Sequence, residues 1–205
     1  MTSVHLAGIA VAIYIISLLP ILALSFYAHP SADDFNYGVK THFAVISDQG
    51  LGGVLQAAWE TVCENYMGWQ GTFSAIFFFS LQPGVFSESA YFFFTTFIMI
   101  GTLSISTVLL MLALYKHVFH GKRSHAVIVS MVLLFLQIQT VYNDTEAFYW
   151  FNGASYYTLF YSFSLLLAAA LISLICSRKI KYMPACIVLA VLVGGENYST
   201  ALCTS

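Results

Sequence analysis

Residues 5–27, HLAGIAVAIYIISLLPILALSFY, decide the fold class of this chain. The run contains no Lys, Arg, Asp or Glu, and as a helix it is long enough to cross a hydrocarbon layer of ~30 Å. No Lys or Arg precedes it, and its apolar part is longer than that of a usual signal peptide. We therefore predict a retained first transmembrane helix.

The composition of the whole chain agrees with this beginning. Of its 205 residues, 60% are hydrophobic and 8% are charged, whereas a soluble domain has roughly 25% charged residues. The sequence therefore predicts an all-α, polytopic transmembrane helix bundle of about five spans, forming a single domain over residues 1–205. After residues 5–27, the segments expected to form spans or to begin one are 89–115, 125–141, 154–176 and 182–193.

A polar segment separates the first two spans. Within it, residues 50–66 place Trp59 and Tyr66 on the apolar face of an amphipathic helix, and Glu60 and Glu64 on the polar face. Such a helix either lies in the membrane interface or docks on other parts of the protein, and both alternatives stay open. The apolar stretch in residues 68–84 is too short to span and is expected to be half-inserted or interfacial.

Basic residues predict how the bundle is oriented. Six of the seven Lys and Arg fall in two short loops, which the positive-inside rule places in the cytoplasm. The segment around Asp33 and Asp34 then lies outside, as does the segment 142–153. A net charge of -2 and the absence of a basic patch interleaved with exposed aromatic residues exclude nucleic acid as a partner. The loop residues are Lys116, Lys122, Arg123, Arg178, Lys179 and Lys181.

The last predicted helix ends in a polar sequence that no further span covers. It carries Glu196 and Asn197 near its outer end, where they would lie at the open edge of the bundle. Ionisable groups at membrane depth are costly and are functional candidates by default, but a position beyond the hydrocarbon would make this pair ordinary. We expect the chain to be the N-terminal part of a longer membrane protein.

The adjacent carboxylates of Asp33 and Asp34 in HPSADDFNYG, residues 29–38, are the first candidate for chemistry. Two neighbouring carboxylates repel each other, so both stay ionised only with water, a metal or a cationic partner close by. One of them could serve as a general base, or the pair could hold a divalent cation. The alternative is a solvated loop in which the aspartates cap a helix.

A second candidate cluster lies in TEAFYWFNGASYY, residues 145–157. Here the ring of Trp150 could stack on a sugar, while the carboxylate of Glu146 and the amide of Asn152 could bind hydroxyl groups. The same aromatic residues are also typical of the belt that anchors a protein at the membrane interface. The sequence leaves these two interpretations open.

The order of four short motifs resembles the GT-C superfamily of integral-membrane glycosyltransferases. More narrowly, the chain is similar to bacterial glucosyltransferase-like families of unassigned substrate, which show an early aspartate pair after the first span. One departure is Thr72, which stands where the resemblance favours an arginine. The four motifs are Asp33-Asp34, Trp69-Gln70-Gly71-Thr72, Tyr149 to Tyr157, and Glu196-Asn197.

The resemblance implies transfer of a sugar from a polyprenyl-phosphate carrier onto a glycan, lipid or protein. The reaction would take place in the bacterial plasma membrane, on the non-cytoplasmic face. Asp33 or Asp34 would be the general base, and a divalent cation stays open because metal dependence varies within the superfamily. The residues implied in substrate binding are Tyr37, Trp69, Gln70, Glu146, Trp150, Asn152, Glu196 and Asn197.

Two other functions are compatible with the same sequence. A transporter or flippase for a lipid-linked or polar substrate would need charged groups near the bilayer midplane and broken helices at the binding site. A non-catalytic membrane scaffold would suit the missing arginine and the short chain. The outward position of the acidic residues favours the enzyme over the transporter.

Overall fold

The computed structural model describes residues 2–196 of the chain, apart from the side chains of residues 88, 90, 92 and 93. Asn197 therefore lies outside the described residues. All regular secondary structure in the described part is helical. The predicted all-α fold class is confirmed.

Within residues 2–196, three helical stretches are long and apolar enough to cross a membrane. They are Ser3–Tyr27, Phe94–His117 and Phe151–Ser177. The first comprises α1 (Ser3–Leu24) with a short 3-10 turn, Ser25–Tyr27, and the second belongs to α5 (Glu88–His117). The third ends in α8 (Phe160–Ser177). These stretches correspond to the predicted segments 5–27, 89–115 and 154–176, so the chain has the composition of a membrane protein.

The helices at the other two predicted spans are apolar but shorter. Helix α6 (Arg123–Gln139) has 17 residues and α9 (Met183–Gly194) has 12. Residues 180–182 form a 3-10 turn that leads into α9. At 1.5 Å per residue, α9 extends over ~18 Å, which is less than the ~30 Å hydrocarbon core of a typical bilayer.

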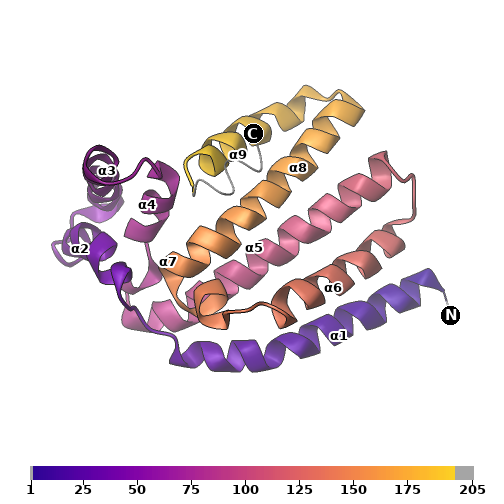
Figure 1. Ribbon diagram of the computed structural model, residues 1–205, viewed down its shortest axis with the longest axis horizontal. Coiled ribbons are helices and arrows are strands. Elements are labelled where there is room, and N and C mark those ends of the chain that lie inside the picture. The colour runs from indigo at the N-terminus through magenta and orange to yellow at the C-terminus, as the bar shows by residue number, and fades with distance from the viewer. Residues whose placement is uncertain (1, 197–205) are drawn as a thin grey trace.

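The long helices lie side by side in the order α1, α6, α5, α8, with α9 next to α8 (Figure 1). Their shared core contains the buried side chains of Tyr91, Met99, Leu134 and Phe148. The loops that follow α5 and α8, which hold the basic residues, lie at the same end as the N-terminus (Figure 1). The charge pattern and the fold thus agree that these loops share one end of the bundle.

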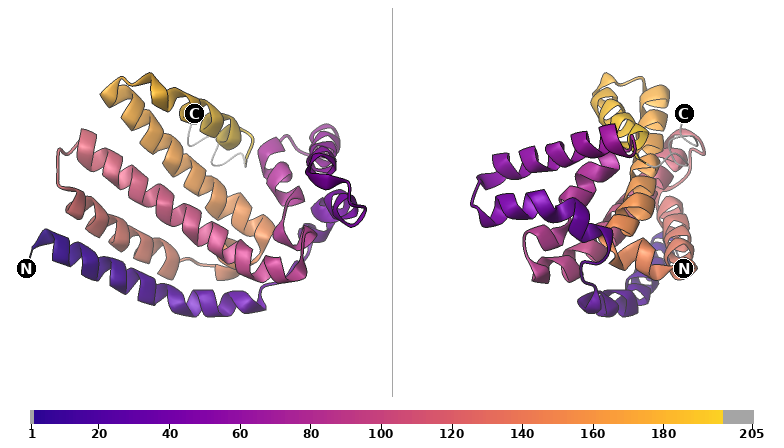
Figure 2. Two further views of the ribbon diagram at one scale, coloured as in Figure 1. Left: turned by 180° about the vertical axis from the view of Figure 1, so that it is seen from behind. Right: turned by 60° about the vertical axis from the view of Figure 1, so that its left-hand side comes forward.

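Three helices gather at the opposite end, as both views in Figure 2 show. They are α2 (Asp33–Ile46), α3 (Gly50–Gly68) and α4 (Phe73–Ser80). The sequence predicted one helix within residues 50–66 and none within 29–49, except in the alternative that Asp33 and Asp34 cap a helix. The structure differs because Asp33 and Asp34 begin a second helix, α2, which packs along α3.

Helix α3 docks on other helices of the protein. Val54 and Ala57 join Ala44 of α2 in a small buried cluster. The buried face is rotated from the predicted one, since Trp59 and Tyr66 are exposed. The small side chains of Ala44 and Ala57 allow α2 and α3 to approach closely. The pattern of hydrophobic residues alone did not predict which face of α3 makes this contact.

Candidate functional site

Asp34 lies in the first turn of α2 and is fully buried. Its Oδ2 accepts hydrogen bonds from the hydroxyl of Tyr91 at 2.6 Å and from the backbone N–H of Ser31 at 3.2 Å. Its Oδ1 accepts one from the backbone N–H of Asn152 at 3.2 Å. These donors belong to three separate parts of the chain, so the carboxylate connects α2 to α5 and to a helix break around Trp150.

The helix break lies around Trp150, which joins a π-helical turn, Thr145–Tyr149, to a short helix, α7 (Phe151–Ala154). Trp150 itself is extended, with φ -94° and ψ 113°. The backbone N–H groups just after it have no carbonyl of a preceding helical turn to bind. The N–H of Phe151 donates instead to the hydroxyl of Tyr91 at 2.8 Å, and the next N–H donates to Asp34.

Burial shifts the acidity of both side chains in this contact. Loss of water raises the pKa of the Asp34 carboxyl above its usual range, although its hydrogen bonds oppose this rise. Loss of water, together with the neighbouring carboxylate, also raises the pKa of Tyr91. Tyr91 therefore remains a hydroxyl that can donate to Asp34, and the contact acts as a fixed structural joint.

Asp33 takes no part in this joint. It is exposed and borders a pocket of about 240 Å³ between α2 and α3. The pocket therefore offers one carboxylate, two amides, one phenol and one indole, all of them polar or aromatic. Its lining residues are Asp33, Asn36, Tyr37, Asn65 and Trp69.

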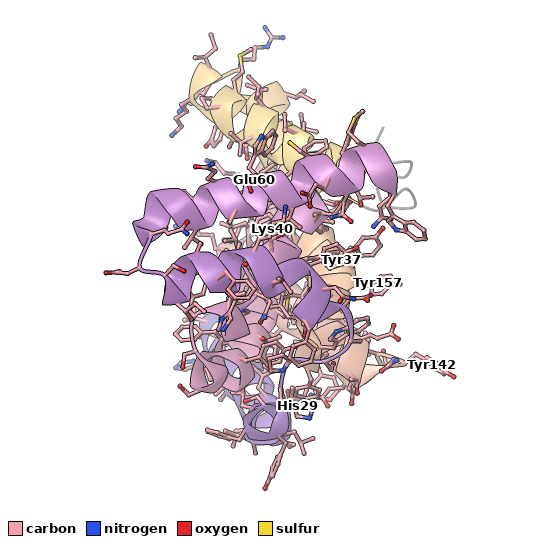
Figure 3. All side chains as sticks on the ribbon, turned by 90° about the vertical axis from the view of Figure 1, so that its left-hand side faces the viewer. His29, Tyr37, Lys40, Glu60, Tyr142 and Tyr157 are labelled. Carbon is pink, nitrogen blue, oxygen red and sulfur yellow. The ribbon has the colours of Figure 1, made fainter. Side chains whose placement is uncertain are left out.

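Hydrogen bonds fix part of the pocket wall. The side-chain amide of Asn65 donates to the carbonyl oxygen of Thr61 at 2.8 Å, one turn earlier in α3. Tyr37 forms a side-chain hydrogen bond with Gln70, and burial raises its pKa. Figure 3 shows Tyr37 on the same side of the molecule as Tyr157. Trp69, by contrast, is 79% exposed, so its ring is available to a ligand.

Trp150 and Asn152 contact the segment around Asp34 and do not line the pocket. The indole N–H of Trp150 donates to the carbonyl oxygen of Ser31 at 3.2 Å, which fixes the chain just before α2. The side-chain amide of Asn152 is buried, and within the described residues neither its nitrogen nor its oxygen has a hydrogen-bond partner. The hydroxyl of Ser155, on the next turn, is buried in the same way.

Glu146 and Glu196 are placed differently. Glu146 is half-buried on the π-helical turn, and its backbone N–H donates to Oδ1 of Asn143. Glu196 follows the end of α9 and is buried. It lies close to the start of α4, since the carbonyl oxygen of the preceding Gly195 accepts the N–H groups of Ser74 and Ala75. Neither carboxylate lines the pocket at Asp33.

The aspartate pair offers a cation a single free carboxylate, because both oxygens of Asp34 already accept hydrogen bonds. Within the described ranges, no three His, Cys, Asp or Glu side chains come together as a metal-binding group. Thr72 is buried, so it does not take the place of a charged contact in the pocket.

Sequence reasoning missed four residues of this site: Ser31, Asn36, Asn65 and Tyr91. Tyr91 lies within the predicted span 89–115, where one aromatic residue among many does not indicate a hydrogen-bonding role. Asn36 follows Asp33 by three residues, a spacing that puts both on one face of a helix and could have marked it. Comparison of the chain with family models, with curated proteins and with solved structures finds no match.

Proposed function

We propose that the chain carries the acceptor-side active site of a membrane glycosyltransferase that uses a polyprenyl-phosphate sugar donor. The observation that supports this most directly is the content of the pocket at Asp33. An exposed indole ring can stack on the apolar face of a sugar, while amide and carboxylate groups bind its hydroxyls. At about 240 Å³ the pocket suits one sugar ring, since pockets for larger ligands measure roughly 300–1,000 Å³.

The geometry suggests different roles for the two aspartates in this proposal. Asp33 is the general base, because its carboxylate is solvated and borders the pocket. Asp34 is a positioning residue, because its oxygens already bind three donors. An acidic side chain in that state has poor access to a substrate proton.

The proposed reaction is a displacement at the anomeric carbon of the donor sugar. The acceptor oxygen forms a bond to this carbon as its proton passes to the carboxylate of Asp33. The bond between the anomeric carbon and the phosphate oxygen breaks, and polyprenyl phosphate leaves with the electron pair. Trp69 and Tyr37 hold the acceptor sugar, which is part of a glycan, a glycolipid or a glycoprotein.

We further propose that α6 and α9 complete a set of five crossings and that α2, α3 and α4 face the outside of a bacterial plasma membrane. The positive-inside rule supports this orientation, because the loops after α5 and α8, which hold the basic residues, lie at the end opposite these three helices (Figure 1). Local thinning of the bilayer accommodates short helices at modest cost.

A transporter for a polar substrate is the second candidate, and one observation favours it. The helix break at Trp150 directs the backbone N–H of Asn152 at the buried carboxylate of Asp34, as half-helix ends do in transporters built from discontinuous helices. Such a protein would need Asp34 for uptake and would not need Asp33.

The deciding experiment compares Asp33→Asn with the wild type in membranes supplied with radiolabelled polyprenyl-phosphate glucose. Transfer of label to membrane glycans that disappears in Asp33→Asn supports the enzyme. Equal transfer in both proteins would remove Asp33 from the mechanism. Uptake of labelled glucose into proteoliposomes, lost in Asp34→Asn and kept in Asp33→Asn, would instead favour the transporter.

A further inference from the structure

A second and larger cavity lies at the opposite end of the molecule, between α5, α8 and α9. Its volume is about 890 Å³. Leu109, Leu112 and Ala113 line it from α5, while Leu166 and Ala170 line it from α8. These positions recur at three- and four-residue spacing, so each helix presents one continuous apolar face to the cavity.

The cavity becomes basic toward the loop that joins α5 to α6. Lys116 and His117 in the last turn of α5, His120 in the loop, and Arg123 at the start of α6 border it there. The ion pair found among the described residues joins Lys40 to Glu64, at the other end of the molecule. Among the described residues, therefore, neither Lys116 nor Arg123 forms an ion pair with a carboxylate.

We propose that this cavity binds an anionic phospholipid from the leaflet that faces the basic end. The apolar helical stretches Phe94–His117 and Phe151–Ser177 supply two of its walls, which would contact an acyl chain. The phosphate group would lie between Lys116 and Arg123, where the helices meet the aqueous phase. Basic pockets between membrane helices bind acidic headgroups in this way.

The apolar length of the cavity favours a lipid over a soluble phosphate compound. From Leu109 to Lys116, α5 rises by ~10 Å, which matches a substantial part of one acyl chain. A soluble anion would cover the basic end and leave these leucine side chains without contact. The small side chains of Ala113 and Ala170 leave space between α5 and α8. Ala185 lines the edge of the cavity on α9 and is exposed.

The test measures binding of phosphatidylglycerol to the detergent-purified chain by native mass spectrometry, with phosphatidylcholine as the uncharged comparison. Each basic residue near an anionic lipid contributes roughly a fivefold gain in affinity. The double variant Lys116→Gln/Arg123→Gln is therefore expected to bind phosphatidylglycerol about 25-fold more weakly. Lys179→Gln/Lys181→Gln is the matched control, because it removes the same charge at the same end, outside the cavity.

Ala185→Trp fills the cavity from an exposed position and should displace the lipid without removing a charge. The proposal is overturned if the Lys116/Arg123 variant keeps its affinity or if the control variant loses as much. It also fails if water-soluble glycerol phosphate competes as strongly as the lipid. A dimer in the mass spectrum that Ala185→Trp dissociates, with lipid binding unchanged, would assign the cavity to a second copy of the chain instead.

Discussion

The hydroxyl of Tyr91 in α5 donates a hydrogen bond of 2.6 Å to the carboxylate of Asp34 in α2, and both residues are fully buried. The same oxygen of Tyr91 also accepts the N–H of Phe151, so it connects α5, α2 and the helix break at Trp150. The two adjacent aspartates therefore have different surroundings. Asp34 forms buried hydrogen bonds between helices, whereas Asp33 is exposed and borders the pocket.

Asp33→Asn should abolish sugar transfer without weakening the fold. General base catalysis contributes roughly 10²–10⁴-fold to rate, and loss of the carboxylate removes this contribution. Because Asp33 is exposed, the free energy of unfolding should change by no more than about 0.5 kcal/mol. Transfer assays and thermal unfolding in detergent measure the two effects. Asp33→Glu is the control, and partial recovery of transfer is expected from it.

Tyr91→Phe should destabilise the protein. The substitution keeps the ring and removes the hydroxyl, which leaves the Asp34 carboxylate without one donor and the Phe151 N–H without its acceptor. A buried group left without its partner costs about 1–3 kcal/mol. The midpoint of thermal unfolding should therefore fall clearly below that of the wild type. Tyr142→Phe is the matched control, since Tyr142 is fully exposed.

The pH dependence of stability should report the Asp34 carboxyl. Burial raises its pKa in the folded protein above the value of ~3.9 for an unfolded chain. The folded state therefore binds the proton more tightly, and this group stabilises the fold most at low pH. The free energy of unfolding should fall as the pH rises from ~4 through the raised pKa, and then become constant.

Asp34→Asn provides the reference for this measurement, because it lacks the titrating group. The unfolding midpoint of the wild type minus that of Asp34→Asn should be more positive at about pH 4.5 than at about pH 7.5. A difference that grows with rising pH would mean that the hydrogen bonds to the carboxylate outweigh its burial. The pKa of Asp34 would then lie below its usual range in the folded protein, contrary to this prediction.

The positions of the long helices could be predicted because uninterrupted apolar runs leave few alternatives. The segments 5–27 and 154–176 fall within the observed apolar stretches that contain α1 and α8. The helix in segment 29–49 was not predicted, although Phe35, Val39 and Phe43 recur there at the four-residue spacing of a helix. Its helix, α2, is held by tertiary contacts, among them Thr41, whose hydroxyl donates to the carbonyl oxygen of Ser80.

The candidate site shows the same division between local and tertiary information. Asp33, Asp34 and Trp69 could be selected from the sequence because charged and aromatic residues are conspicuous beside apolar spans. Which aspartate is buried could not be predicted, since both occupy the first turn of one helix. The answer depends on Tyr91, which comes from a helix more than fifty residues away in the chain.

Trp69→Ala should weaken acceptor binding while leaving stability nearly unchanged. The ring is 79% exposed, so the fold gains little from it, and a stacked sugar would lose its main apolar contact. The expected result is a several-fold higher KM for the acceptor with kcat reduced less. Trp69→Phe should restore most of the binding. Loss of kcat with an unchanged KM would contradict the stacking role.

Asn152→Leu tests whether the interior beside Asp34 is kept polar for function. The amide of Asn152 is buried without a hydrogen-bond partner among the described residues, and such a group costs about 1–3 kcal/mol. Leucine has a similar volume and leaves the backbone N–H to Asp34 intact, so the unfolding midpoint should rise. If the amide serves the substrate, transfer should fall as stability increases, which is the trade-off expected of a functional polar group. Ser155→Ala is the companion variant, because its hydroxyl is buried in the same condition one turn later. A lower unfolding midpoint in Asn152→Leu would show that the amide already stabilises the folded protein, and the polar interior would then need no functional explanation.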